Sequence, residues 1–258
     1  MIGNNHIGKN GRLGNQMFQY ASLRGIAAKH NYDWCIPPSS FRDAERDHQL
    51  FEAFELESLQ STKLLDAKYL EESSFNFDQE LFDTCPDNIN LYGFFQSEKY
   101  FTHIADSIKE DFAFKDYILN PCKEMFTFGS EVISLHIRRT DYVDKQEYHP
   151  LCTLEYYEKA LSMLPNNIPV IIFSDDPKWC KIQQIFEDDR FLVSESNNNL
   201  VDMCLMTMCK YHIIANSSFS WWGAWLSNSK KVIAPKVWFG PSANIDDTDL
   251  VPDRWERI

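Results

Sequence analysis

Short apolar runs alternate with amphipathic segments throughout the second half of the chain. The runs predict strands at residues 132–137, 170–173, 191–193, 211–215 and 231–234. Between them, apolar residues recur at helical spacing, and they predict helices from Thr153, over 179–186, over 201–210 and from about Ser218. Alternation of this kind is typical of a parallel sheet with helices on both faces and right-handed crossovers. We therefore expect a Rossmann-like nucleotide-binding domain.

The first half opens with a glycine-rich turn and a helix. Gly11 and Gly14 come just before apolar residues at helical spacing, which places Asn15 and Gln16 on the first helical turn. Backbone N–H groups at such a helix start can meet an anion or a sugar hydroxyl. A plain helix start with no ligand explains the pattern equally well.

The region from 31 to 90 has no sustained hydrophobic period. Its acidic and aromatic run, 43–87, predicts short helices and loops that could form the wall of an acceptor site. A strand is expected around 89–94, and then one amphipathic helix with its apolar face over 101–112 and Ser97 as its cap.

A linker is expected between the two halves. Pro121 and Gly129 bracket it, because proline and glycine interrupt regular structure. The expected domains are therefore 1–126, on the acceptor side, and 127–258, which would bind a nucleotide.

The charge balance limits the partners. A net charge of −13 argues against nucleic acid and against an anionic membrane surface, so an anionic ligand must meet a local basic site. No apolar run reaches the length of about 18 residues that a membrane span needs, and the first 15 residues lack the apolar core of a signal peptide. We expect a cytoplasmic protein without a transmembrane segment, which leaves room for peripheral association with a membrane.

The seven cysteines form no CxxC pair. An odd count without paired spacing predicts neither a disulfide framework nor a zinc site, and we expect reduced thiols that are mostly packed.

Two adjacent arginines follow the predicted strand 132–137. The carboxyl end of a strand is where open α/β sheets bind ligands. If the strand geometry persists, Arg138 and Arg139 point to opposite sides. One of them can then bind a pair of phosphates with two hydrogen bonds, while the other is anchored to protein. A guanidinium does this without a metal ion. The alternative is a solvated pair in a loop.

Carboxylates follow the next strands along the chain. Asp175 and Asp176 could hold Mg²⁺ or Mn²⁺, but such sites use spaced aspartates, so we favour a hydrogen-bonding role without a metal. Asp202 either caps the helix that it begins or accepts hydrogen bonds from a base or a ribose.

Small polar residues precede the last predicted helix. Asn216, Ser217, Ser218 and Phe219 offer hydroxyls and backbone N–H groups to a phosphate, which the helix dipole also favours. With Arg138 arriving from a neighbouring strand, a diphosphate could be held between them. Ordinary capping by Asn216 or Ser217 is the alternative, and the tryptophans at 221 and 222 are expected in the core.

Five motifs together resemble the alpha-1,2-fucosyltransferases of bacterial surface-glycan synthesis. They are GRLGNQMFQYA from residue 11, GFFQSEKYF from 93, HIRRTDY from 136, FSDDPKWC from 173 and HIIANSSFSWWGAWL from 212, in the family's order. The resemblance implies an α/β, GT-B-like architecture of two Rossmann-like domains facing a cleft. It also implies GDP-L-fucose as the donor, a terminal β-galactoside as the acceptor, inversion at the anomeric carbon, and no metal or other cofactor.

The resemblance also implies residue roles. Arg138 would bind the β-phosphate and Arg139 would support the site. The core fucosyltransferase of N-glycans shares the histidine-x-arginine-arginine pattern and an aspartate sixteen residues before a phosphate-binding serine, a spacing met here by Asp202 and Ser218. By that likeness, His136 and Asp202 would read guanine. Asn15 matches an asparagine that protein O-fucosyltransferases carry near the reacting centre.

The chain departs from the family at its start. The family usually has an apolar strand before the glycine-rich motif, whereas residues 1–10 are polar here. Either the first strand is missing, or the start codon is misassigned, or the sheet begins elsewhere.

The mechanism expected from the resemblance is direct displacement at fucose C1 by the galactose 2-hydroxyl. Arg138 and Ser218 would stabilise the charge that grows on the β-phosphate. Asp141 is the carboxylate nearest to the arginines in sequence and is a candidate base, but it could instead orient them, and a phosphate oxygen could take the proton in a dissociative reaction. Other hypotheses are a transferase for a related GDP-sugar, a catalytically silent nucleotide- or glycan-binding protein, and a metal-dependent GT-A enzyme.

Overall fold

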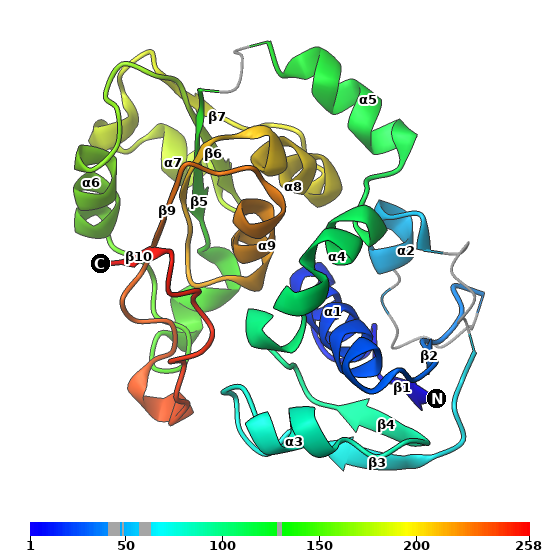
Figure 1. The fold of residues 1–258 in the computed structure, drawn as a ribbon. Helices are drawn as coiled ribbons and strands as arrows, with labels where there is room; N and C mark the ends of the chain where they lie inside the picture. The colour runs from blue at the N-terminus through cyan, green and yellow to red at the C-terminus, as the bar shows by residue number, and fades with distance from the viewer. Residues whose placement is uncertain (41–46, 48, 57–62, 128–130) are drawn as a thin grey trace. The chain divides into compact units, whose positions relative to one another are not determined.

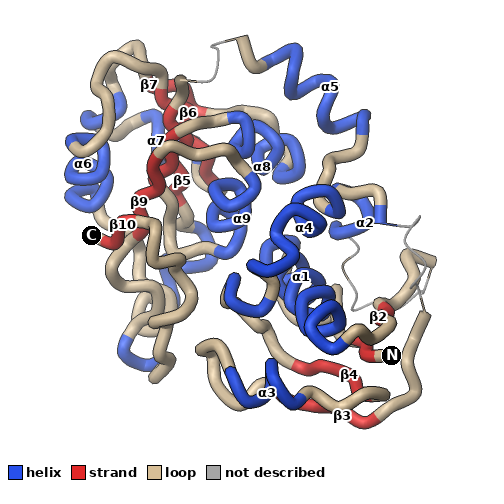
Figure 2. The backbone as a smooth tube through the Cα atoms, viewed as in Figure 1, coloured by secondary structure: helices blue, strands red, loops and turns tan. Residues whose placement is uncertain are grey.

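The computed structural model describes residues 1–40, 47, 49–56, 63–127 and 131–258. These residues form two compact units, one made of 1–115 with 245–252, the other of 116–244 with 253–258. Each unit has its own parallel sheet with helices packed on it (Figures 1 and 2).

The units divide at residue 115 rather than at the expected boundary after 126. Helix α5 (Asp116–Met125) packs on α8 (Asn199–Met208), where the Cys122 thiol donates to the Val201 carbonyl at 3.7 Å. Pro121, expected at the linker, therefore lies inside a helix of the second unit, while Gly129 is outside the described residues.

The sheet of the first unit has four parallel strands in the order β2-β1-β4-β3. Their bounds are Ile2–Gly3 for β1, Trp34–Cys35 for β2, Lys68–Glu71 for β3 and Ile89–Tyr92 for β4. The possibility that the first strand is missing was wrong, because β1 pairs with both β2 and β4. It is only two residues long, too short to show an apolar run, yet Ile2 is fully buried.

The helices of the first unit are α1 (Leu13–His30), α2 (Gln49–Ala53), α3 (Gln79–Thr84) and α4 (Ala105–Asp111). The single helix expected over 101–112 was wrong in extent, because two 3-10 turns, η2 (Glu98–Tyr100) and η3 (Thr102–Ile104), precede α4. Ser97 caps the first turn and accepts the backbone N–H of Lys99. Part of the acidic run 43–87 lies outside the described residues.

The sheet of the second unit has six parallel strands in the order β10-β9-β8-β5-β6-β7. Their bounds are Ile133–Ile137 for β5, Val170–Ser174 for β6, Phe191–Val193 for β7, Tyr211–Ile213 for β8, Lys231–Ala234 for β9 and Glu256–Arg257 for β10. Counted from β5, this order is 3-2-1-4-5-6, the order of the doubly wound dinucleotide fold. The expected Rossmann-like domain is confirmed.

Helices cover both faces of this sheet. They are α6 (Leu154–Ser162), α7 (Pro177–Lys181), α8 and α9 (Ser218–Leu226), with short turns η4 (Thr140–Lys145), η5 (Gln184–Phe186) and η6 (Pro241–Ala243). Figure 1 shows α6 on one face and α8 and α9 on the other. Thr153, where a helix was expected to begin, caps α6 by accepting the N–H of Tyr156.

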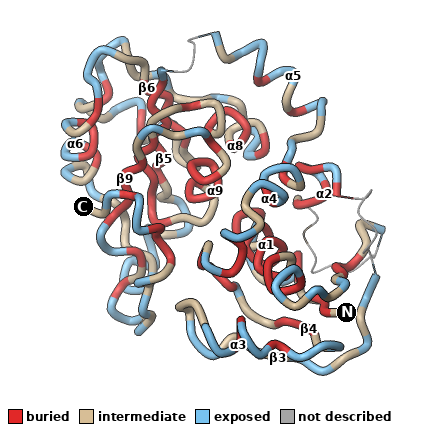
Figure 3. Tube along the Cα trace, in the orientation of Figure 1, coloured by how far each residue is buried: buried red, intermediate tan, exposed pale blue. Residues whose placement is uncertain are grey.

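The core of the second unit is built on β5, whose five residues are all buried (Figure 3). The expectation that Trp221 and Trp222 lie in the core is confirmed, since both are fully buried on α9. The cysteines form no disulfide, and all are buried except the half-buried Cys152. Within the described residues, no helix is both long and apolar enough to cross a bilayer.

Candidate active site

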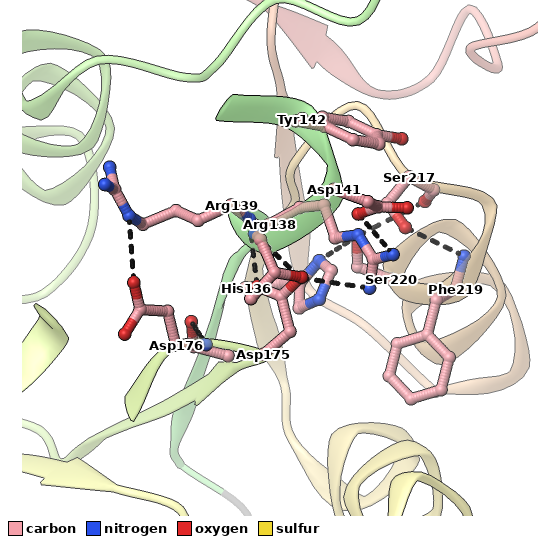
Figure 4. A network of polar contacts seen from close by, with 12 residues as sticks. His136, Arg138, Arg139, Asp141, Tyr142, Asp175, Asp176, Ser217, Phe219 and Ser220 are labelled. Carbon is pink, nitrogen blue, oxygen red and sulfur yellow. Dashed lines mark hydrogen bonds and ion pairs between the residues drawn. The ribbon is translucent and has the colours of Figure 1, made fainter. Parts of the chain in front are cut away.

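The candidate site lies at the carboxyl ends of β5 and β8. These strands are neighbours in the second sheet, and the chain leaves β5 toward β6 but leaves β8 toward β9, on the other side. The strand order therefore reverses between them, which is where doubly wound sheets bind ligands. The HIRRTD segment begins on the last two residues of β5 and continues beyond it, and residues 214–220 follow β8 (Figure 4).

Arg138 is the first residue beyond β5, and two carboxylates hold its guanidinium. Nη2 lies 2.6 Å from an oxygen of Asp141, and Nη1 lies 3.2 Å from an oxygen of Asp175. Only 17% of the Arg138 side chain is exposed, so its rotation is restricted. The contact to Asp141 favours the orienting role for that residue over the role of base.

Arg139 turns away from Arg138 and is anchored to protein (Figure 4). Its Nε is 3.4 Å from Asp176 Oδ2, and its guanidinium carbon is 4.0 Å from the centre of the Trp179 ring. The other oxygen of Asp176 accepts the backbone N–H of Trp179 and caps α7. The two arginines thus point to different sides, and the expected anchoring of one of them to protein is seen at Arg139. The contacts of Asp176 are to protein groups.

Asp175, for which the sequence favoured a hydrogen-bonding role, organises the loop that follows β5. Its carboxylate accepts the backbone N–H groups of Arg139, at 2.9 Å, and Thr140, at 3.2 Å, and the Thr140 hydroxyl at 2.6 Å. The same carboxylate pairs with Arg138. Its position directly after a predicted strand was the signal for that hydrogen-bonding role.

His136 points from β5 toward α9. Its Nδ1 lies 2.9 Å from the Ser220 hydroxyl, and its ring centre lies 5.7 Å from that of Phe219. Burial, with the nearby positive charge of Arg138, lowers the pKa of His136 to about 3. The imidazole is therefore neutral at physiological pH and can offer a lone pair or a single N–H to a ligand. Ser220 was not among the expected residues.

The start of α9 carries the hydroxyls expected to meet a phosphate. Ser217 is the cap, and its hydroxyl accepts the backbone N–H of Phe219 at 3.4 Å. Ser218 is the first helical residue, and the first turn contains no acidic side chain to compete with an anion. Asn216 is buried, and its amide donates to the carbonyls of Pro150 and Trp238, both at 2.9 Å, which fixes the chain just before the helix.

Tyr142 links the arginine loop to the start of α9, although the sequence had not marked it. Its ring centre lies 5.6 Å from the guanidinium carbon of Arg138, and its hydroxyl donates to the Asn216 carbonyl at 3.1 Å. Burial raises its pKa to about 12, so the hydroxyl keeps its proton. Tyr142 and His136 together bring the Arg138 loop and the first turn of α9 to one edge of the sheet.

Asp202 lies on the first turn of α8, but it does not cap that helix. Asn198 does so by accepting the N–H of Leu200, which corrects the capping alternative. Oδ1 of Asp202 accepts the hydroxyls of Ser194, at 2.6 Å, and Ser196, at 2.8 Å. Burial raises the pKa of Asp202, and the two serines oppose that shift. A half-buried carboxylate of this kind can still accept the N–H groups of a base.

Asn15 belongs to the first unit and lies on the first turn of α1. Its side-chain oxygen accepts the amide of Gln96 at 2.8 Å. Gly11, before the helix, has a φ of +85°, and a Cβ there would come within 2.1 Å of the Asn15 amide nitrogen. A glycine is required at this position because only it allows both the backbone conformation and the close approach of Asn15.

The charged groups at the edge of the second sheet suit a phosphate ligand. Among the described residues, no three or more histidine, cysteine or acidic side chains gather as they would around a metal ion. Positive charge comes from a guanidinium and from the start of α9, and both bind phosphate oxygens. Arg138 is held in place but still presents donors, so the arrangement can stabilise a departing phosphate.

Comparison with known proteins identifies the family. The chain is 34% identical to an alpha-1,2-colitosyltransferase of Escherichia coli, with 96% of each chain covered. It is 29% identical to the O-antigen biosynthesis glycosyltransferase WbnK of the same species, covering 96% of this chain and 98% of that one. In structure it is similar to the alpha-1,6-fucosyltransferase NodZ, with a TM-score of 0.57 at 15% identity over 88% of this chain and 92% of the other. Residues 1–246 match the sequence model of glycosyl transferase family 11, so the chain belongs to this family and has the two α/β domains of a GT-B-like glycosyltransferase.

Proposed function

We propose that the protein transfers L-fucose from GDP-L-fucose to the 2-hydroxyl of a terminal β-galactoside, with inversion, in the synthesis of a bacterial surface glycan. The observation that carries this proposal is the Arg138 guanidinium, which Asp141 and Asp175 hold at the switch point of the second sheet, beside the start of α9. Family membership supports it, as do the names of the relatives, among them an O-antigen glycosyltransferase. The NodZ structure with the same fold was soaked with GDP-fucose.

In this proposal the second unit grips the donor by its diphosphate. Arg138 donates two hydrogen bonds to the β-phosphate, while Ser218 and the N–H groups of the first turn of α9 bind it from the helix side. The neutral His136 and the half-buried Asp202 read guanine. The ion pair of Arg139 with Asp176 stabilises the loop that follows β5.

The reaction is a single displacement. The galactose O2 forms a bond to fucose C1 as the bond from C1 to the β-phosphate oxygen breaks, and GDP leaves with that electron pair. Because negative charge grows on the β-phosphate as the bond breaks, donors already aimed at it help most in the transition state. The hydroxyl proton passes to a phosphate oxygen or to a carboxylate. Asp141 is the candidate carboxylate in sequence, but its ion pair with Arg138 favours the orienting role for it. Asn15 lies near the reacting centre in this proposal and orients the acceptor.

We infer that the reaction needs no metal ion, because guanidinium and helix-dipole charge stand where a cation would otherwise be used. We place the enzyme in the cytoplasm, in peripheral contact with the membrane where its glycan acceptor is carried. The absence of a disulfide among its seven cysteines, which all lie in described segments, is in keeping with a reducing compartment.

A second donor is favoured by one observation. The relative that is 34% identical is a colitosyltransferase, so an activated colitose, another deoxysugar, is the alternative donor for the same site. Neither the phosphate contacts nor the guanine contacts would distinguish colitose from fucose, because the sugar lies beyond them.

The test is incubation with GDP-fucose, GDP-colitose and GDP-mannose, each against a panel of galactose-terminated glycans, with the products identified by mass and linkage analysis. The proposal predicts an alpha-1,2-fucosylated product that also forms in EDTA. Transfer of colitose alone would replace the donor assignment. Binding of GDP by calorimetry without any transfer would instead identify a silent binding protein.

A further inference from the structure

The loop that follows β4 has an unusual backbone. Gly93 has a φ of +155° and Phe95 a φ of +52°, a region that residues with a side chain seldom occupy. A Cβ at Gly93 would come within 2.5 Å of the Glu72 Cβ. Such a conformation persists only where the surrounding contacts determine it.

Glu72, just beyond β3, supplies the central contact. One oxygen of its carboxylate accepts the backbone N–H of Phe94 at 2.8 Å, and the other accepts the N–H of Phe95 at 2.9 Å. From the other side, α1 holds the same loop: Gln19 donates to the Gly93 carbonyl at 3.1 Å and Ser22 to the Phe95 carbonyl at 3.0 Å. An ionised carboxylate accepts strongly with both oxygens, whereas an amide replaces one acceptor by a donor and the hydroxyl oxygen of a protonated acid is a weaker acceptor.

The position of this loop affects Asn15 through the side chain of Gln96. Phe95 is fully buried, with its ring edge-to-face on Tyr100 at 5.5 Å. The next residue, Gln96, is only 6% exposed and donates its amide to Asn15 at 2.8 Å. A displacement of residues 94 and 95 would therefore move the hydrogen bond that orients Asn15.

We propose that Glu72 is a positioning residue for the transfer reaction, whose carboxylate clamps Phe94 and Phe95 so that Gln96 holds Asn15 in the orientation that the acceptor requires. This inference rests on the proposed function of Asn15. It assigns Glu72 no contact with the substrate.

The clamp should respond to pH. Burial raises the pKa of Glu72 to about 7, against the opposite effect of its two N–H donors, and the charge of Asp78 adds to the rise. Among the residues that the structure describes, Asp78 and Tyr100 are the charged and titratable groups that act on it. Hydrogen bonds lower the pKa of Asp78, and burial raises that of Tyr100, so neither changes its charge near neutral pH. The Glu72 carboxylate is ionised above about pH 7, and below this pH one of its oxygens carries a proton and becomes a poorer acceptor.

The test compares Glu72→Gln with Glu71→Gln, a change at the exposed neighbouring residue. For Glu72→Gln we expect kcat to fall about tenfold or more, with KM for GDP-fucose unchanged. The wild type and Glu71→Gln should lose activity as the pH falls through about 7. The activity of Glu72→Gln should not fall in this pH range. The inference would be overturned if Glu72→Gln had the kcat of the wild type, or if its activity fell near pH 7 as that of the wild type does.

Hydrogen exchange over residues 93–97, measured at one pH, provides a readout that does not depend on turnover. Glu72→Gln should exchange faster there than Glu71→Gln, and equal protection would also overturn the inference. If the wild type transfers no sugar, the proposed function fails while this readout still decides on the clamp. If Glu72→Gln does not fold, Gln96→Leu tests the same chain of contacts, with an expected loss of kcat at wild-type thermal stability, and full activity in that variant would refute it.

Discussion

At the residue scale, the histidines of the second sheet show how burial sets chemistry. His136 and His212 both lie within strands and are almost completely buried. Because burial disfavours the charged form, the pKa of His136 falls to about 3 and that of His212 to about 4. Both rings are therefore neutral near pH 7; the first lies against the Ser220 hydroxyl at 2.9 Å and the second against the Cys209 carbonyl at 3.3 Å.

The difference can be measured as a pH dependence of stability. Between pH 6.5 and about 4, His212 takes up a proton in the unfolded chain but not in the folded one, so the free energy of unfolding drops as the pH falls. Relative to His212→Gln, the wild type should lose about 1.4 kcal/mol per pH unit across this window and nothing further below it. Urea unfolding at several pH values measures this, and a constant difference between the two proteins would contradict the assignment.

At the scale of elements, the start of α9 carries a serine that caps the helix and a serine that we propose to bind phosphate. Ser217 caps the helix, while Ser218 begins it. We expect Ser217→Ala to lower the free energy of unfolding by about 1 kcal/mol, the usual value of a lost cap. Ser218→Ala should leave stability nearly unchanged and weaken GDP binding about tenfold, as expected for one hydrogen bond to a charged group.

Urea unfolding and calorimetry on the two variants test this directly, each serving as the control of the other. The assignment is wrong if Ser218→Ala destabilises the protein as much as Ser217→Ala and binds GDP normally.

The elements also show what the sequence could predict. The strand of residues 133–137 and its two arginines were predictable because the apolar run has little polar interruption and the charged residues follow it at once. The role of Asp175 was not, because it depends on the register that pairs Ile137 with Ser174. The Glu72 clamp was hidden for the same reason: it joins residues far apart in sequence, and β3 is a mostly exposed edge strand with no apolar period.

At the scale of the whole molecule, two parallel sheets divide the work that we propose. The second unit has the 3-2-1-4-5-6 strand order and gathers His136, Arg138 and the start of α9 at its switch point. The first unit carries Asn15 and the loop that holds it. Motifs from both units contribute to the family resemblance, and the match to family 11 over residues 1–246 confirms it. The two-residue strand β1 could not be read from composition because its burial arises only from pairing on both sides.

The central claim is that Arg138 and the first turn of α9 together grip the diphosphate of the donor. Calorimetric titration of the wild type and Arg138→Lys with GDP and with guanosine tests it. Arg190→Lys is the control, because Arg190 lies at the amino end of β7, at the end of the sheet opposite to the site. We expect Arg138→Lys to bind GDP at least about tenfold more weakly, because a point charge cannot replace the guanidinium fork, and to bind guanosine as before. Wild-type affinity for GDP in Arg138→Lys, or an equal loss for guanosine, would contradict the claim.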